Sequence, residues 1–232
     1  MDYMNRNNFW NKEYKNPTHL DISDKPAEDL IKFARWLQKK YGKKFLNPTV
    51  NVLDLGCGNG RNLLYLASNF NCRGMGIDIS EEAINLAKRS VHNMPIDFFV
   101  RSIKKPLLLP DKSVIIVLDM MASHTLRATE RVVLRDEIRR VLKPSGWLFF
   151  KSFLLEDDIN AARLIKENPA DEPNSYIHPT LKLFEHVWTE DEIRKFFGKH
   201  FKIHYLSKSR KHILHGHAFK RRTASVYLEK ID

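Results

Sequence analysis

Apolar positions along this chain follow two alternating spacings. Short apolar runs, typical of strands, occur at 52–55, 74–77, 96–100, 114–118 and 147–153. Apolar residues at helical spacing predict helices at 26–40, 61–68, from Ser80 through 87, at 130–142 and from Thr189 onward. We take Asp24 as the cap of the first of these helices. Strands that alternate with helices predict an α/β protein with a parallel, doubly wound sheet.

The chain reads as one domain, 1–232, in four segments. Residues 1–47 form an N-terminal helical and aromatic cover, and 48–153 form the core of alternating strands and helices. Residues 154–188 form a connection longer than a link between a strand and a helix needs, and we expect a lid-like insertion that faces a substrate. Residues 189–232 hold a final helix and two strands, at 202–206 and 225–229, separated by a basic stretch.

The most informative motif is a glycine turn between the first strand and the first core helix. The strand ends in Asp54, and Gly56, Gly58 and Gly60 follow at spacings of two. Glycine lets the backbone turn sharply and approach a ligand closely, and the turn leads into a helix N-terminus. The second strand ends in Asp78, whose carboxylate is suited to accept hydrogen bonds from two ribose hydroxyls. This arrangement predicts a site for a nucleoside-containing cofactor.

The spacing of the motif discriminates between cofactors. A dinucleotide fingerprint needs its third glycine where this chain has Arg61, and a P-loop needs a Gly-Lys-Ser/Thr that is absent here. Asp54 is poorly placed for a pyrophosphate but well placed for a cationic ligand. S-adenosylmethionine carries an ammonium and a sulfonium and no phosphate. The pattern therefore favours this cofactor over NAD, FAD or ATP.

The glycine turn, Asp78 and a later turn at 141–150 (VLKPSGWLFF) together resemble the class I S-adenosylmethionine-dependent methyltransferase family. The resemblance covers 51–153 and implies a Rossmann-like, mostly parallel, seven-stranded sheet whose last strand is antiparallel. It also implies that an aromatic N-terminal segment such as 9–14 lies over the cofactor; packing of these aromatic residues against the core is the alternative. In the family an acid after the third strand often holds the adenine amino group, whereas here Ser102 occupies that place.

The resemblance implies roles for individual residues. The three glycines allow close approach to the methionyl part, Asp54 contacts its ammonium and Asp78 the ribose hydroxyls; the adenine is flanked by Ile79, Ser102 and Ile103. Asp119 ends the fourth strand, where the family places residues beneath the transferring methyl group. His124 follows shortly after and is a candidate general base or substrate-orienting group, although a structural histidine is an open alternative.

The methyl acceptor is less constrained by the sequence. The chain has a net charge of +11, and residues 199–232 hold nine Lys and Arg against two acidic residues. This imbalance slightly favours RNA or another polyanion as partner, with a solvated surface as the plain alternative. A small-molecule or protein acceptor, a non-catalytic RNA-binding module and a nicotinamide-dependent oxidoreductase stay open. The residues after Asp119 lack the motif of amino-directed DNA methyltransferases.

Three further features bound the function. Cys57 and Cys72 are expected to be reduced packing residues. No apolar run has the length of a membrane span and the N-terminus lacks a signal-peptide core, so we expect a cytoplasmic protein. His212, His215 and His217 lie among lysines and arginines and lack a clear fourth ligand, so no metal is expected.

Overall fold

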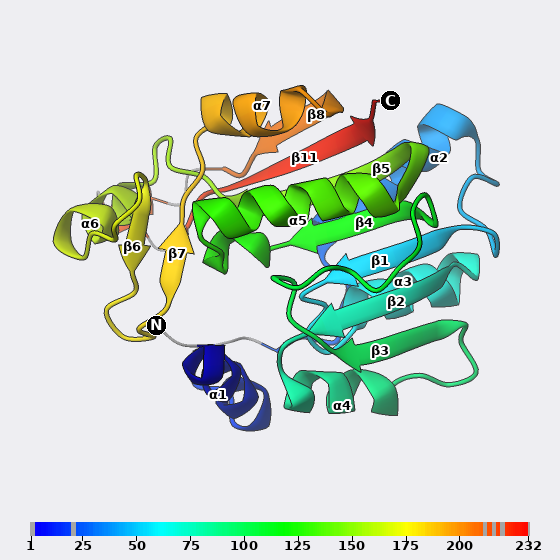
Figure 1. Cartoon of the computed structure of the whole chain (residues 1–232), viewed down its shortest axis with the longest axis horizontal. Coiled ribbons are helices and arrows are strands. Elements are labelled where there is room, and N and C mark those ends of the chain that lie inside the picture. The colour runs from blue at the N-terminus through cyan, green and yellow to red at the C-terminus, as the bar shows by residue number, and fades with distance from the viewer. Residues whose placement is uncertain (1–2, 20–21, 211–212, 215–216, 219–220, 232) are drawn as a thin grey trace.

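The computed structural model describes residues 3–19, 22–210, 213–214, 217–218 and 221–231. Its centre is a seven-stranded sheet in the order β3-β2-β1-β4-β5-β11-β8, which Figure 1 shows almost in full. Only β11 runs antiparallel to its neighbours β5 and β8. This confirms the predicted fold class. The strands are β1 (Asn51–Leu55), β2 (Arg73–Asp78), β3 (Ile96–Val100), β4 (Val114–Met120), β5 (Leu142–Phe153), β8 (Phe201–Lys208) and β11 (Thr223–Lys230).

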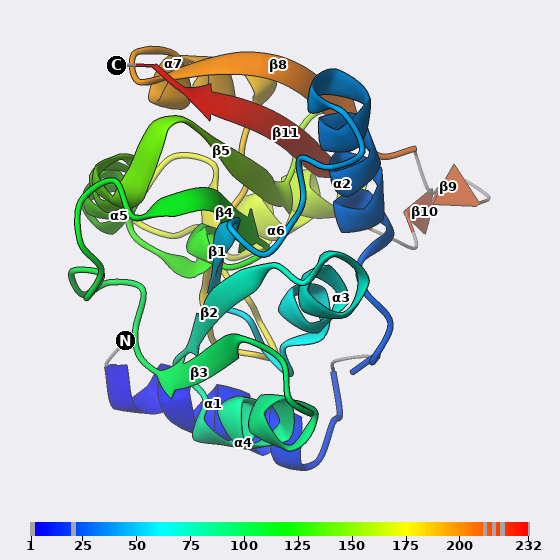
Figure 2. The same cartoon turned by 90° about the vertical axis from the view of Figure 1, so that its right-hand side faces the viewer.

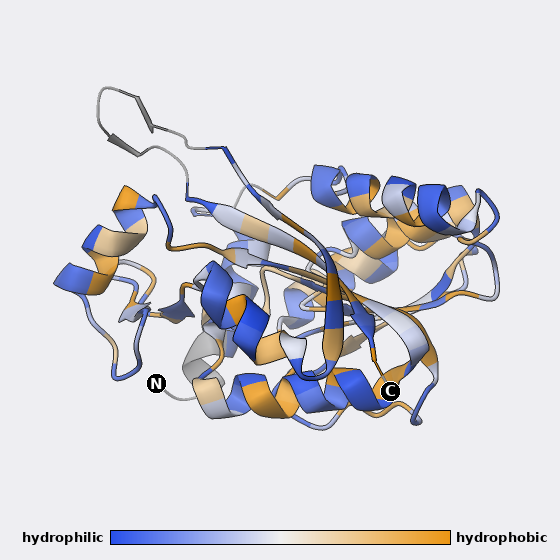
Figure 3. Cartoon of the chain, turned by 90° about the horizontal axis from the view of Figure 1, so that it is seen from above, coloured by the Kyte–Doolittle hydropathy of each residue, from blue (hydrophilic) through white to orange (hydrophobic). Residues whose placement is uncertain are grey.

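Helices cover both faces of the sheet (Figure 2), so the sheet separates the core into two main apolar layers. On one face α2 (Glu28–Tyr41), α3 (Arg61–Phe70) and α4 (Glu81–Arg89) contribute Phe33, Leu63 and Ile84 to one apolar cluster. On the other face α5 (Ala128–Val141) and α7 (Glu190–Gly198) contribute to a second cluster. Figure 3 shows that these helices carry polar and apolar residues together, as expected when one stripe of a helix faces a sheet.

The connection from β3 to β4 contains no helix. Residues 101–113, all of them described, form turns and irregular backbone over β1 and β2. Doubly wound folds usually cover both faces of the sheet with helices. Here the face that carries α5 is therefore covered by a loop alone at the end of the sheet formed by β1, β2 and β3.

The insertion at 154–188 is ordered. It contains α6 (Ile159–Glu167) and a two-stranded antiparallel sheet of β6 (Ser175–Ile177) and β7 (Phe184–His186). This unit has its own small apolar cluster, and β7 contacts the short 3-10 helix η1 (Ser123–Thr125) that follows β4. In Figure 1 the insertion lies at the end of the molecule to which the parallel strands point. Its role as a lid stays a prediction.

Some predicted boundaries differ from the structure. Helix α2 begins at Glu28 with Ala27 as its N-cap and no side-chain cap, so the prediction of Asp24 as the cap was wrong. Strand β5 begins at Leu142, directly after α5, and not at 147. The aromatic segment at 9–14 belongs to a further helix, α1 (Tyr3–Lys15). Among the described residues, no helix is long and apolar enough to cross a membrane.

Candidate cofactor site

Three acidic residues gather at the carboxyl ends of neighbouring parallel strands. In the register of the sheet, Leu55 at the end of β1 pairs with Ile77 on one side and with Asp119 on the other. Asp78 is the last residue of β2, and Asp54 lies one residue before the end of β1. After β1 the chain continues to β2 and β3 on one side of β1 and then crosses to β4 on its other side. Open α/β sheets bind ligands at such a switch point.

The glycine turn has a backbone that other residues rarely adopt. Gly56 and Gly58 have φ angles of +66° and +55°, in the region that favours glycine. A Cβ on Gly56 would lie 2.6 Å from Cβ of Ala122, and a Cβ on Gly58 would lie 2.3 Å from the hydroxyl of Tyr14. A side chain at either position would fill the space above the strand ends.

Gly60 meets a different constraint. Its φ is +77°, but a Cβ there would lie 2.5 Å from Cζ of Phe98, within the core beneath α3 and α4. The structure therefore explains this glycine by packing and backbone conformation, whereas the sequence led us to expect contact with the methionyl part.

Asp78 is anchored by the backbone. Its Oδ2 accepts a hydrogen bond from the N–H of Gly58, and its Oδ1 accepts one from the N–H of Ser80, both at 2.9 Å. Burial raises the pKa of Asp78, and these hydrogen bonds oppose the rise. A carboxylate has about four acceptor positions, so Asp78 keeps acceptor capacity for a ligand hydroxyl.

Asp54 is the least satisfied polar group of the site. It is 2% exposed, and among the described residues its Oδ2 has no hydrogen-bond partner. Burial, followed by the charges of Asp78 and Asp119, raises its pKa to about 8. Burial also raises the pKa of Asp119 to about 6, although Asp119 accepts a hydrogen bond from the N–H of Ser123 at 3.1 Å. No described ion pair involves any of these three acids.

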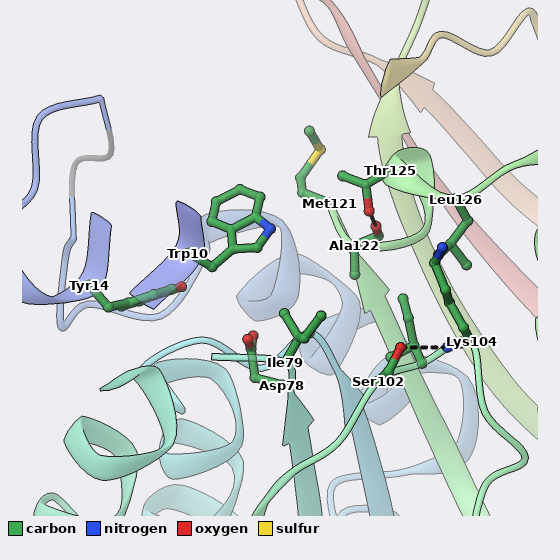
Figure 4. A pocket seen from close by; sticks show the side chains of 12 residues that line it. Trp10, Tyr14, Asp78, Ile79, Ser102, Lys104, Met121, Ala122, Thr125 and Leu126 are labelled. Carbon is green, nitrogen blue, oxygen red and sulfur yellow. Dashed lines mark hydrogen bonds between the residues drawn. The ribbon is translucent and has the colours of Figure 1, made fainter. Parts of the chain in front are cut away.

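A pocket opens beside these strand ends (Figure 4). Five of the predicted cofactor residues line it: Gly56, Asp78, Ile79, Ser102 and Ile103. The other predicted cofactor residues, Asp54, Gly58, Gly60 and Asp119, do not line this pocket; Asp54 and Asp119 lie buried at the strand ends. The pocket is completed by residues that the sequence did not single out as cofactor ligands: Trp10, Tyr14, Lys104, Met121, Ala122, Thr125 and Leu126.

Helix α1 forms one wall of the pocket. Trp10 and Tyr14 extend from it toward Asp78 and Ile79 in Figure 4. The helix is held in place by Asn11, whose Oδ1 accepts a hydrogen bond from the hydroxyl of Ser80 at 2.8 Å. Of the two predicted arrangements of the aromatic segment, the structure shows the one over the pocket. The alternative, packing of these aromatic residues against the core, is distinguished from this arrangement by tertiary contacts alone.

At the end of α1, Glu13 organises the chain that follows. This carboxylate is 1% exposed and accepts hydrogen bonds from the hydroxyl of Thr18 at 2.6 Å and the backbone N–H of His19 at 2.9 Å. Burial alone would raise its pKa, but these hydrogen bonds lower it to about 2. Glu13 therefore remains ionised over the physiological pH range.

His124 does not line the pocket. It is 6% exposed, its ring lies edge-on against Phe153 with ring centroids 5.1 Å apart, and its Nδ1 has no partner among the described residues. Burial lowers its pKa to about 4, and the nearby Arg221 adds to this effect. The histidine is therefore neutral at physiological pH and lies within η1, which strand β7 of the insertion contacts.

The site fits a cationic nucleoside ligand. Placing three buried carboxylates together without a cation is costly, because burial and mutual repulsion both oppose ionisation. A ligand ammonium near Asp54 would remove that cost. Asp78 has acceptor positions for ribose hydroxyls, and the bare glycine backbone leaves room above the strands. S-adenosylmethionine has all of these complementary groups.

Comparison with known proteins agrees with this geometry. Residues 52–146 match the family model described as a methyltransferase domain. The chain is 28% identical over 143 residues to the fatty-acid O-methyltransferase of Mycolicibacterium smegmatis, covering 61% of this chain and 51% of that protein. It is 30% identical over 144 residues to phthiotriol/phenolphthiotriol dimycocerosates methyltransferase 1 of Mycobacterium ulcerans, covering 60% and 49%. Residues 52–146 therefore carry a methyltransferase domain, in agreement with the class I S-adenosylmethionine-dependent methyltransferase family that the motifs resemble.

A solved structure shows the same fold. The Burkholderia thailandensis 1,6-didemethyltoxoflavin-N1-methyltransferase, determined with bound 1,6-didemethyltoxoflavin and S-adenosylhomocysteine, superposes with a TM-score of 0.69 at 15% identity. The match covers 99% of this chain and 88% of that one. The chain spans about half the length of the curated relatives described above.

Several basic side chains of the C-terminal segment at 199–232 make contacts within the protein. Among its described residues, four basic side chains bind groups of the protein itself: Lys208 pairs with Glu190, Arg221 with Asp158 and Arg222 with Asp157, and the Nζ of Lys230 donates to the carbonyl of Leu142. The histidines considered for metal binding, His212 and His215, lie outside the described residues, as does the side chain of His217. Among the described residues, no cluster of metal-ligating side chains is found.

Proposed function

We propose that this protein is an S-adenosylmethionine-dependent methyltransferase that acts on a small molecule. The observation that carries the proposal is the buried Asp54, whose Oδ2 has no partner among the described residues. It lies at the strand ends beside which the pocket of Asp78 and Gly56 opens. A carboxylate held in this state is complementary to a cationic amino-acid group. When it is bound, the cofactor supplies the electrophilic methyl group.

A small-molecule acceptor is better supported than RNA. Both curated relatives described above are named for lipid acceptors, and the solved neighbour binds a small heterocycle. The basic C-terminal segment favoured RNA in the sequence analysis. Several of its basic side chains instead form ion pairs within the protein. The alternative that the sequence left open, a small-molecule acceptor, is therefore our proposal.

The chain's own residues mainly hold and align the reactants. Methyl transfer from a sulfonium is an in-line displacement, and good positioning of the reactants can contribute up to roughly 7–11 kcal/mol to lowering the barrier of such a reaction. We assign Asp54 to the ammonium, Asp78 to the ribose hydroxyls, and Ile79, Ser102 and Ile103 to the adenine. Asp119 lies at the end of β4 and holds the N–H of Ser123, which fixes the start of η1.

The acceptor is proposed to enter between α1 and η1. This part of the pocket is bordered by Trp10, Met121, Thr125 and Leu126, which favour an acceptor with apolar surface. The insertion at 154–188 contacts η1 through β7 and is proposed to close over this side as a lid. His124 reaches an acceptor only if η1 moves, so we assign it a role in positioning η1.

Two measurements test this function. Calorimetry with S-adenosylhomocysteine tests the cofactor site, and the proposal fails if no binding is detected for the wild type. Incubation with S-adenosylmethionine labelled in its methyl group, together with separated metabolite, protein and RNA fractions of a cell extract, tests the acceptor. Label in the metabolite fraction is expected. Label confined to RNA would reverse our choice of acceptor and leave the cofactor assignment intact.

A further inference from the structure

A second cavity lies on the face of the sheet that carries α5, where no helix of the described part of the chain covers β1, β2 and β3. Its volume is about 300 Å³. Residues from three strands and from the loop that replaces the usual helix line it, and its walls are apolar: Leu53, Met75, Ile77, Phe99, Leu107 and Leu109. The cavity is within the size range of small-molecule sites. Nothing in the proposed methyl transfer uses it.

Apolar surface is exposed around this cavity. Phe99 is 46% exposed and Leu108 is 77% exposed, although both border the cavity. Exposed apolar side chains that form one patch mark a binding surface more often than isolated ones do. A ligand with an apolar body would remove this surface from water.

The cavity also has a cationic wall. Arg101 lines it, and one guanidinium nitrogen, Nη2, donates to the carbonyl of Pro106 at 2.5 Å. The Nε of Arg101 is buried and has no partner among the described residues. None of the residues that line the cavity is acidic. A guanidinium with unused donors prefers a carboxylate or another anion.

We propose that this cavity binds an amphipathic carboxylate of the fatty-acid type, with its chain against Met75 and Phe99 and its headgroup at Arg101. The site is distinct from the cofactor pocket. The two pockets lie on either side of the segment that follows β3: Arg101 lines this cavity, and the next residue, Ser102, lines the cofactor pocket. The proposal does not depend on methyl transfer.

Methionine methyl groups provide a direct test. Met75 lines the second cavity and Met121 lines the cofactor pocket, so protein labelled with ¹³C at the methionine methyl groups reports on both sites. Decanoate, added below its micellar concentration, is expected to shift the Met75 signal and leave that of Met121 unchanged. S-adenosylhomocysteine is expected to do the reverse. Met75→Leu and Met121→Leu variants assign the two signals.

The charge is tested by paired ligands and paired variants. Decanol is expected to bind about tenfold more weakly than decanoate, since it lacks the headgroup charge. Arg101→Gln is expected to reduce decanoate affinity about tenfold and leave decanol affinity unchanged. Lys105→Gln is the matched control, because Lys105 lies in the same loop but does not line the cavity.

Three results would overturn the proposal. The first is equal binding of decanol and decanoate by the wild type. The second is a decanoate shift at Met121 that S-adenosylhomocysteine abolishes, which would place the fatty acid in the acceptor site. The third is the absence of a shift at Met75 together with a dimer in sedimentation that Phe99→Lys dissociates, since a second copy would then cover the patch.

Discussion

Asp54→Asn is the most informative substitution in this protein. It replaces a buried carboxylate by an amide of nearly the same size, so it removes the charge with little change in packing. The pKa of Asp54 is raised to about 8, mainly by burial, whereas an unfolded chain has a pKa near 3.9. We expect the substitution to stabilise the free protein and to weaken cofactor binding.

The sign follows from proton linkage. Between about pH 4 and pH 8 the folded protein keeps the Asp54 proton and the unfolded chain has lost it, so stability falls as the pH rises. The loss is about 1.4 kcal/mol per pH unit and levels off above pH 8. Between pH 6 and pH 8 the wild type should lose about 2 kcal/mol that Asp54→Asn retains.

Cofactor binding should respond in the opposite direction. The ammonium of the ligand binds the ionised carboxylate, so S-adenosylhomocysteine must displace the Asp54 proton below pH 8. Wild-type affinity should rise roughly fivefold from pH 7 to pH 8, with proton release visible as a buffer-dependent heat. Asp54→Asn should lose this pH dependence and bind about ten- to one hundredfold more weakly, as expected for a lost charged hydrogen bond.

Urea unfolding at pH 6 and pH 8 and calorimetry in two buffers measure both effects. Asp97→Asn is the matched control, since Asp97 is exposed on β3, and it should change neither quantity. The reasoning is refuted if Asp54→Asn is less stable than the wild type at pH 8, or if its affinity for S-adenosylhomocysteine is unchanged.

Three other predictions concern the walls of the site. Gly58→Ala should weaken S-adenosylhomocysteine binding at least tenfold in calorimetry, because the φ of Gly58 is +55° and the added Cβ would displace Tyr14. Gly198→Ala is the control: its Cβ would have no neighbouring atom within 4 Å, so this variant should bind the ligand normally. Glu13→Gln should cost about 1–3 kcal/mol of unfolding free energy at pH 7; since the pKa of Glu13 is about 2, this difference should disappear as the pH falls from about 4 to 2. Ser80→Ala should cost about 1 kcal/mol, because its hydroxyl caps α4 by accepting from the N–H of Ala83, and an unchanged unfolding midpoint would contradict this role.

The sequence by itself determined the sheet, the glycine turn and the cofactor class. Each depends on local rules: strand and helix spacing are short-range, and a glycine with positive φ is needed wherever the backbone takes that conformation. The acids at the ends of β1, β2 and β4 follow from the same rules, because the carboxyl ends of parallel strands meet at one edge. Asp54, Asp78 and Asp119 were therefore predictable from position alone.

Tertiary structure decided which side chains close the site. Trp10 and Tyr14 lie more than forty residues before the glycine turn. Helix α1 is placed beside the pocket by its contacts with α4, which include the hydrogen bonds that Asn11 accepts from Ser80 and from the N–H of Glu82. No local pattern distinguishes such a helix from one packed in the core. Likewise, the sequence led to no prediction for the structure of the segment at 101–113. The sheet face beneath it is covered by this loop alone, because no helix among the described residues packs there.

Which basic side chains remain available to a partner was also decided by the tertiary structure. A count of basic residues in 199–232 suggested a polyanion, but a count does not show which charges face solvent. Arg221 and Arg222 bind acids of the insertion, and Lys230 reaches a backbone carbonyl. Electrostatic attraction depends on distance and burial, and both are set by contacts between segments that are far apart in the chain.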